Sequence, residues 1–169
     1  MMTDIVFDTN VLAELLVQYY GDNVREKGCF ESKGFLNKDL VREMNRTVRR
    51  HAENDGSSYP GLLMASSFAF VEIARKFDEI AGGRFTTEQF AAFIEQPPEW
   101  FFIADVDASL FPHLNRLPRE ISLPNGNIKP LEWADAIHAA TALSRDDPWL
   151  LAATDSRIKQ VAVLKDRII

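Results

Sequence analysis

The chain has 169 residues, of which 46% are hydrophobic and 26% are charged, a composition typical of globular proteins. Its formal net charge of -6 argues against a generally basic nucleic-acid coat, whereas clustered carboxylates that hold metal ions would also make the charge negative. The one cysteine, Cys29, excludes an intramolecular disulfide and is typical of a reducing compartment. No signal-peptide pattern precedes the first apolar segment, and no apolar run is long enough to span a membrane. We therefore expect a cytoplasmic protein with no membrane partner.

Apolar segments and helical patterns alternate along the chain, without an internal repeat or a linker. This alternation favours an α/β fold, with a central, mainly parallel sheet and helices on both faces, in a single domain over residues 1–169. The expected strands comprise residues 5–7, 62–65, 100–104, 149–153 and 161–164. The expected helices begin after residue 8, at 36, at 66 or 67, at 86 or 87, at 107 and near 131. Residues 20–35 should contain turns, and residues 117–130 should form a long irregular connection, because glycine, proline and asparagine punctuate both.

Asp8 stands where the first expected strand, Ile5 to Phe7, ends and a helix carrying Val11 and Leu12 begins. In an α/β protein this position is the carboxyl edge of the sheet, where ligand sites form. The alternative is that Asp8 or Asn10 only caps the helix, since both side chains accept hydrogen bonds from free N-terminal amides. We expect Asn10 to act as a cap or to support a neighbouring site residue.

The expected helix over residues 36–52 has an apolar side and a basic side. The basic side is a stripe that consists of Lys38, Arg42, Arg46 and Arg49. Its simplest interpretation is a solvated helix face. The functional alternative is that the stripe contacts the phosphates of RNA, because an acidic protein needs some local positive surface to bind a polyanion.

Glu72 and Asp135 are acids inside two later helices. Glu72 lies among apolar neighbours, where a charged residue is seldom found unless it is paired or bound to a metal. An ion pair with Arg75 or Lys76 is the alternative. Asp135 falls in the first turns of its helix, where the helix dipole also stabilises an acid. His138, one turn later, is interpreted as a packed or surface residue and is left outside the site.

Asp155 repeats the setting of Asp8, because it follows an apolar strand and precedes a short helix. If the strands are parallel, Asp8, Glu72, Asp135 and Asp155 share one edge of the sheet. Ligand sets made only of oxygen select hard cations such as Mg²⁺ or Mn²⁺. A carboxylate-held Mg²⁺ serves phosphodiester chemistry, since it lowers the pKa of a bound water and neutralises charge on the phosphoryl oxygens.

These four acids and their flanks resemble the motifs of PIN domains. The matching segments, in order, are Asp8–Leu12, Phe70–Ala74, Trp133–Ala142 and Thr154–Ile158. The resemblance covers nearly the whole chain. PIN domains often carry a threonine two residues before the last acid, where this chain has Ala153, and Thr154 is the candidate to supply that hydroxyl.

The resemblance implies a Mg²⁺- or Mn²⁺-dependent endoribonuclease with Asp8, Glu72, Asp135 and Asp155 as its catalytic and metal-binding residues. Many family members are toxins of VapBC-type toxin–antitoxin pairs, so a small antitoxin partner and a homodimer are implied as well. Two alternatives stay open. A metal-dependent phosphatase of the haloacid dehalogenase type also begins with an acid at a strand end, but it needs a second acid where this chain has Asn10. The other alternative is a catalytically silent PIN-like binding module.

Overall fold

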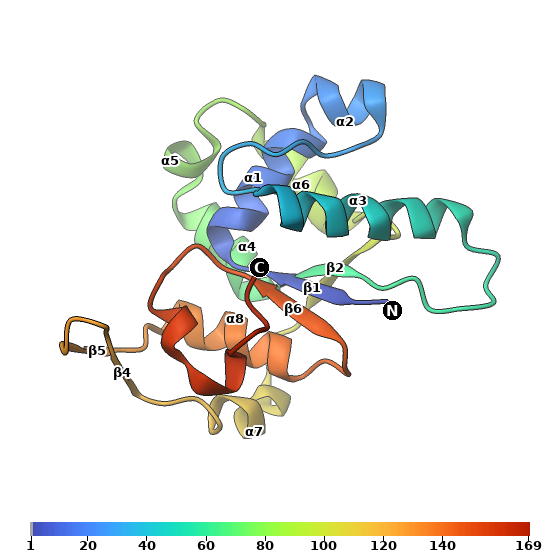
Figure 1. Cartoon of the computed structure of the whole chain (residues 1–169). Coiled ribbons are helices and arrows are strands. Elements are labelled where there is room, and N and C mark those ends of the chain that lie inside the picture. Colours follow the sequence, from blue (N-terminus) through green and yellow to red (C-terminus); the bar gives the residue numbers. More distant parts are fainter. Residues whose placement is uncertain (1) are drawn as a thin grey trace.

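The computed structural model describes residues 2–169, apart from the side chain of Asn23. Four parallel strands form its main sheet in the order β3–β2–β1–β6. Their bounds are Phe101–Ala104 for β3, Leu63–Ser66 for β2, Asp4–Phe7 for β1 and Trp149–Ala152 for β6. Val6 of β1 lies beside Met64 on one side and Leu151 on the other. The predicted α/β class and the parallel sheet are confirmed (Figure 1).

Both faces of the sheet are buried, because the two sides of β1 belong to different cores. Ile5 and Phe7 pack in one hydrophobic cluster and Val6 in the other, and all three side chains are fully buried. Continuous apolar segments such as this are typical of parallel strands that are covered on both faces. The sequence pattern that predicted β1 therefore reflects packing from above and below.

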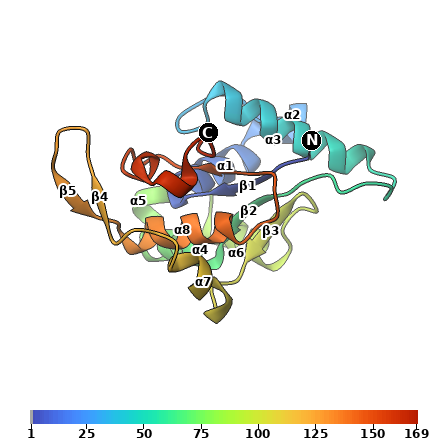
Figure 2. The ribbon, with the colours of Figure 1, turned by 60° about the horizontal axis from the view of Figure 1, so that its bottom comes forward.

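The first cluster is covered by the helices of the N-terminal two thirds of the chain. They are α1 (Thr9–Tyr19), α3 (Lys38–Glu53), α4 (Ser67–Arg75) and α6 (Thr87–Glu95). The second cluster is covered by α8 (Trp133–Leu143) with the short 3-10 helices η2 (Ile158–Gln160) and η3 (Ala162–Leu164). Figure 2 shows α3 and α8 on opposite sides of the strands. Among the described residues, none of the helices combines the length and the apolar character that crossing a bilayer requires.

Several predicted elements need correction. Residues 20–35 contain the short helix α2 (Asp22–Lys27), which ends at Gly28 in the left-handed conformation that glycine adopts at low cost. The predicted helix after Ser66 ends early, and a separate helix α5 (Phe77–Ala81) continues the chain. The predicted strand over residues 161–164 is η3, because a short apolar run fits either a strand or a buried helical turn.

The region from 117 to 130 is also more regular than predicted. It contains an antiparallel hairpin of two short strands, β4 (Glu120–Ser122) and β5 (Ile128–Pro130). Before it, the 3-10 helix η1 (Ala108–Leu110) and α7 (Phe111–Leu114) follow the predicted cap residue Asp107. β3 was expected to be buried, but it is an edge strand in which only Phe101 is fully covered. α7 lies next to α8, whereas the hairpin extends away from the rest of the chain (Figure 1).

A buried polar network closes the amino edge of the sheet, opposite the end at which Asp8 lies. The Asp4 carboxylate accepts hydrogen bonds from the Tyr59 hydroxyl (2.6 Å), the Leu62 amide (3.0 Å) and Arg145 Nε (3.0 Å). Asp4 is only 4% exposed, so these donors replace water around its charge. Burial and the hydrogen bond to Asp4 raise the pKa of Tyr59 to about 12.

Candidate active site

Asp8 lies directly after β1 and holds two segments together. One carboxylate oxygen accepts from the Val11 amide (2.8 Å) and thereby caps α1, as the structural alternative predicted. The other oxygen accepts from the backbone amide (2.6 Å) and the hydroxyl (2.9 Å) of Thr154, which follows β6. Asp8 is 6% exposed, and its charge is balanced by these three donors. Asp8 therefore caps α1 and also lies at the edge of the sheet where a ligand site was expected.

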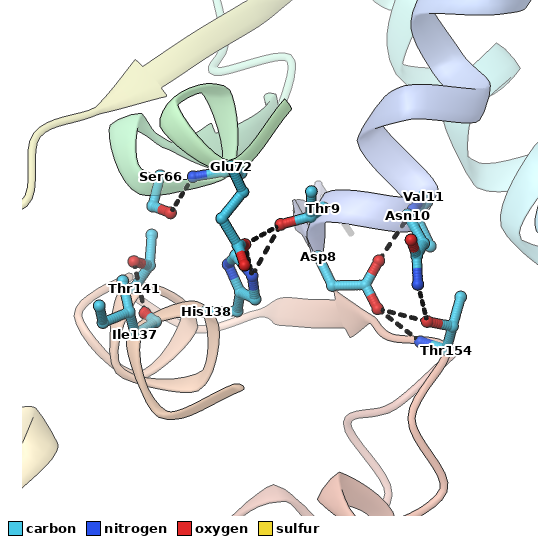
Figure 3. A network of polar contacts seen from close by, with 11 residues as sticks. Asp8, Thr9, Asn10, Val11, Ser66, Glu72, Ile137, His138, Thr141 and Thr154 are labelled. Atoms are coloured by element: carbon cyan, nitrogen blue, oxygen red, sulfur yellow. Dashed lines mark hydrogen bonds and ion pairs between the residues drawn. The ribbon is translucent and has the colours of Figure 1, made fainter. Parts of the chain in front are cut away.

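Asn10 and Thr154, the two residues expected to support the site, bond to each other. The Asn10 amide donates to the Thr154 hydroxyl (3.1 Å), and that hydroxyl donates to Asp8 (Figure 3). Asn10 therefore does not cap α1 but orients the threonine that orients Asp8. The Thr154 hydroxyl contacts Asp8, and its role in place of a hydroxyl at the position of Ala153 stays a prediction.

Glu72 projects from α4 toward Thr9 and His138 (Figure 3). The Thr9 hydroxyl donates a short hydrogen bond to Glu72 Oε2, and His138 Nε2 lies 3.2 Å from the Thr9 oxygen and 3.6 Å from Glu72 Oε2. Because the single hydroxyl proton of Thr9 goes to Glu72, His138 must donate to the Thr9 oxygen through Nε2. The His138 imidazole is the main cause that lowers the pKa of Glu72, despite the partial burial that opposes it.

His138 is a packed residue, as one of the two interpretations of the sequence predicted, but it packs beside the predicted acids and not away from them. His138 is 3% exposed and lines the same cleft as Glu72, and its Nδ1 has no hydrogen-bond partner among the described residues. The alternative for Glu72 was an ion pair with Arg75 or Lys76. In the structure its partner is instead this histidine, which comes from α8. The spacing of three residues between Asp135 and His138 places both on one face of α8 and was the available signal. The proximity of Thr9 could not be read from the sequence.

Asp135 occupies the first turn of α8, as predicted. Its carboxyl is about half buried, and no described residue donates a hydrogen bond to it. Burial raises the pKa of Asp135, and the neighbouring charges of Asp155 and Asp8 raise it further. A carboxylate that lacks donors and faces like charges is the kind of group that a cation stabilises.

Asp155 is held differently, by an arginine two residues later. Arg157 Nε lies 2.9 Å and its Nη2 2.5 Å from Asp155 Oδ2, and the same guanidinium reaches Glu132 at 3.5 Å. The hydrogen bonds from Arg157 lower the pKa of Asp155. Arg157 therefore neutralises part of the acidic cluster, and Asp155 would share its carboxylate between this arginine and any bound cation.

All four predicted acids line one cleft of about 270 Å³ at the carboxyl edge of the sheet. The other residues in its wall are Thr9, Asn10, Lys76, Glu79, Ile80, Ala134, His138 and Thr154. Asp8, Asp135 and Asp155 interact electrostatically on one side, whereas Glu72 interacts with His138 and Lys76. Lys76 was predicted only as an alternative ion-pair partner of Glu72, and Glu79 was not predicted, because the sequence was expected to form one continuous helix where the chain turns from α4 into α5.

The basic stripe of α3, which we call the α3 stripe, consists of Lys38, Arg42, Arg46 and Arg49. It does not line this cleft. Arg42, Arg46 and Arg49 border a separate hollow of about 360 Å³ on α3. Arg42 is paired with Asp39 (3.0 Å) and Arg46 with Glu43 (2.8 Å), so part of the positive charge is balanced on the same helix. Contact between the stripe and RNA stays a prediction.

The donor set of the cleft suits a hard divalent cation, since it contains only oxygen ligands apart from His138. Within the described part of the chain, no three His, Cys, Asp or Glu side chains converge closely enough to form a preassembled metal cage. Mg²⁺ does not need such a cage, because it keeps several waters and binds through one or two carboxylates together with substrate phosphates. The unpartnered Asp135 carboxyl beside Asp8 and Asp155 fits this mode of binding.

Fold and cleft together define an α/β protein with a carboxylate-lined pocket at the carboxyl edge of a parallel sheet. Comparisons of the chain with protein-family models, with curated proteins and with solved structures found no match. An assignment of function therefore depends on the chemistry of the cleft and on the four motifs.

Proposed function

We propose that the protein is a Mg²⁺- or Mn²⁺-dependent endoribonuclease with a PIN-like fold. The observation that supports this best is the meeting of four carboxylates in one cleft at the carboxyl edge of the sheet. They come from segments far apart in the sequence, and their order and flanks are those of the PIN motifs. In an open cleft, carboxylates of this kind suit a charged phosphodiester substrate that arrives with a cation.

In this proposal Asp8, Asp135 and Asp155 hold the cation. When bound, the cation would lower the pKa of a water molecule and neutralise charge on the phosphate. Asp8 is rigidly placed by Thr154 and the first turn of α1, so it fixes the position of the site. Asp135 has free lone pairs and a raised pKa, and it gains most from a nearby positive charge.

Glu72 has a different role, because its pKa is lowered by His138 and it is therefore a weak base. Held by Thr9 and His138, it orients the attacking water rather than removing a proton from it. Lys76 lies in the same wall and offers the cleft an exposed positive charge for a phosphate oxygen. In this proposal the side of the cleft with Asp8, Asp135 and Asp155 binds the cation, and the side with Glu72 and Lys76 orients the water and the substrate.

The decisive test is cleavage of single-stranded RNA by the purified protein with Mn²⁺, Mg²⁺ or EDTA, beside a small phosphate monoester. We expect RNA fragments only with a divalent cation. A matched variant, Glu95→Gln, removes an exposed acid outside the cleft and should cleave normally, whereas Asp8→Asn should not. Hydrolysis of the ester alone would favour the phosphatase, and binding without cleavage the silent module.

The resemblance to PIN domains adds a cellular role to the proposal. If the protein is a toxin, a small antitoxin would cover the acidic cleft, and the toxin would form a homodimer in the cytoplasm. Purification from the native host under mild conditions tests this directly. A small partner protein that inhibits cleavage would support the assignment, and a lone active monomer would contradict it.

The α3 stripe provides a prediction about substrate binding. Replacing both Arg42 and Arg46 by glutamate should weaken RNA binding and flatten its dependence on salt, because fewer counterions are released. The same double substitution breaks three ion pairs on α3, so a control that replaces both arginines by glutamine separates charge reversal from loss of pairing. Unchanged affinity and salt slope would make the stripe a solvated face.

A further inference from the structure

An apolar groove adjoins the acidic cleft on the other side of the first turn of α8. It has a volume of about 440 Å³, and its wall includes Phe111, Leu117, Arg119, Leu131 and Trp133. Ala134 and Asp135 line the cleft, whereas Trp133 and Ala136 line the groove. A ligand that spans both hollows would therefore pass across the first turn of α8.

Two aromatic side chains in this groove are largely exposed. Trp133 is 75% exposed and Phe111 is 68% exposed. By contrast, Trp149 is 6% exposed and Phe101 is 4% exposed, in the core. Large exposed aromatic surfaces beside a functional cleft mark binding sites more often than single scattered apolar residues do. The flat faces of tryptophan and phenylalanine suit another flat ring.

The charge around the groove favours a polyanion over an apolar peptide. Arg119 lies in its wall, and Arg116 lies between the lining residues Asn115 and Leu117. Both arginines are exposed, and no ion pair joins either of them to another described residue. The groove therefore offers aromatic rings that can contact a base and unpaired arginines that can contact the phosphate backbone of a nucleic acid. The acidic cleft beside it would bind a phosphate only together with a cation.

We infer that this groove is a base-binding subsite, in which Trp133 and Phe111 stack on an unpaired nucleobase of an RNA that crosses the first turn of α8 into the acidic cleft. This inference rests on the proposed function and adds how the substrate is held. Stacking of a base on an aromatic side chain tolerates any base, because every base has a π-face. The subsite accordingly selects single-stranded RNA over duplex and does not read sequence through hydrogen bonds.

The test measures binding without cleavage, in EDTA, with a short single-stranded RNA and a copy in which one internal position is abasic. We expect Trp133→Ala to weaken binding of the intact RNA about tenfold, within the range of base-stacking losses on alanine substitution. The wild type should prefer the intact RNA, and Trp133→Ala should lose most of that preference. Trp133→Phe keeps an aromatic face and should restore it.

Phe35→Ala is the matched control, because Phe35 is 53% exposed but does not line the groove. It should bind like the wild type. An unchanged preference for the intact RNA in Trp133→Ala would overturn the subsite. So would a dimeric wild type that Trp133→Ala makes monomeric with RNA affinity unchanged, since the groove would then bind a second copy.

The outcomes also separate the subsite from the proposed function. Wild-type cleavage together with unchanged binding by Trp133→Ala would remove the subsite alone. A wild type that binds intact RNA through Trp133 yet cleaves nothing with Mn²⁺ would support the subsite and remove the nuclease. A wild type that neither binds nor cleaves RNA would remove both.

Discussion

Replacing Asp135 by asparagine is expected to abolish RNA cleavage while making the metal-free protein more stable. The carboxyl is half buried, accepts no hydrogen bond from the described residues and faces Asp155 and Asp8, so removal of its charge relieves both burial and repulsion. The loss of cleavage should be about a thousandfold or more, since cation binding contributes several kcal/mol to stabilising the transition state. Thermal melts in EDTA and a cleavage assay with Mn²⁺ measure the two effects.

The stability of the metal-free protein should also depend on pH in a direction that the pKa of Asp135 determines. The pKa of Asp135 is raised above its usual 3.8, so the folded state keeps a proton that the unfolded state releases. The contribution of Asp135 to the free energy of unfolding is fully present below pH 3.8. It is lost as pH rises through the higher pKa of the folded state. Asp135→Asn should lack this loss. Added Mn²⁺ should raise the melting temperature of the wild type more than that of the variant.

Asp155→Asn is the matched comparison, because it removes an acid from the same cleft with the opposite effect on stability. Arg157 lowers the pKa of Asp155, so this ion pair stabilises the folded state above the usual pKa of an aspartate. The variant should lose cleavage and also lose stability in EDTA. Equal stability changes in Asp135→Asn and Asp155→Asn would contradict the electrostatic account of the cleft.

Asp4→Asn is expected to have the largest effect on stability and almost none on cleavage per folded molecule. The Asp4 carboxylate is buried at the amino edge, where it accepts from Tyr59, Leu62 and Arg145. An asparagine would turn an amide donor toward one of these donors and would leave Arg145 without its charged partner. The cost is about 3 kcal/mol. That cost corresponds to a fall of roughly 10 °C in the melting temperature for a chain of this size.

Tyr59→Phe tests the same network through pH. The Tyr59 pKa is raised to about 12 from 10.0, so the folded state holds the phenolic proton longer than the unfolded state does. The stability that this difference provides is present below pH 10.0 and is lost as pH rises toward 12. Tyr59→Phe should therefore be less stable than the wild type at neutral pH and should lose less stability in alkali. Parallel pH curves for the two proteins would mean that burial and the bond to Asp4 do not raise the pKa of Tyr59 in the folded protein.

The strands that carry the cleft could be predicted because each is a short apolar segment followed by a polar residue. Asp8 after β1 and Asp155 after β6 repeat this pattern, and parallel strands bring such ends to one edge. The helix starts at 66 or 67 and at 86 or 87 were also predicted, because a hydroxyl before an apolar helical pattern satisfies free amides of the first turn, and the structure selects Ser66 and Thr86 as the caps. Local chemistry and sheet topology were sufficient for these features.

Other features depend on contacts between distant segments. The strands of the β4–β5 hairpin are three residues long and bury only Ile121, so they leave no periodic pattern in the sequence. Arg157 controls the charge of Asp155 through side-chain geometry that spacing does not reveal. His138 belongs to the cleft because α4 brings Glu72 to it and α1 brings Thr9 to it, and within its own segment the spacing from Asp135 is the one signal that links it to the site.

The position of β1 between β2 and β6 has a consequence for synthesis of the protein on the ribosome. β1 is made well before its neighbour β6 and the Asp8 partner Thr154. At ordinary translation speeds this interval is on the order of ten seconds. During it, β1 has an unpaired edge that can pair with another nascent chain. A chaperone that covers β1 in this interval should therefore raise the yield of folded protein, and the complete acidic cleft exists only after translation of β6.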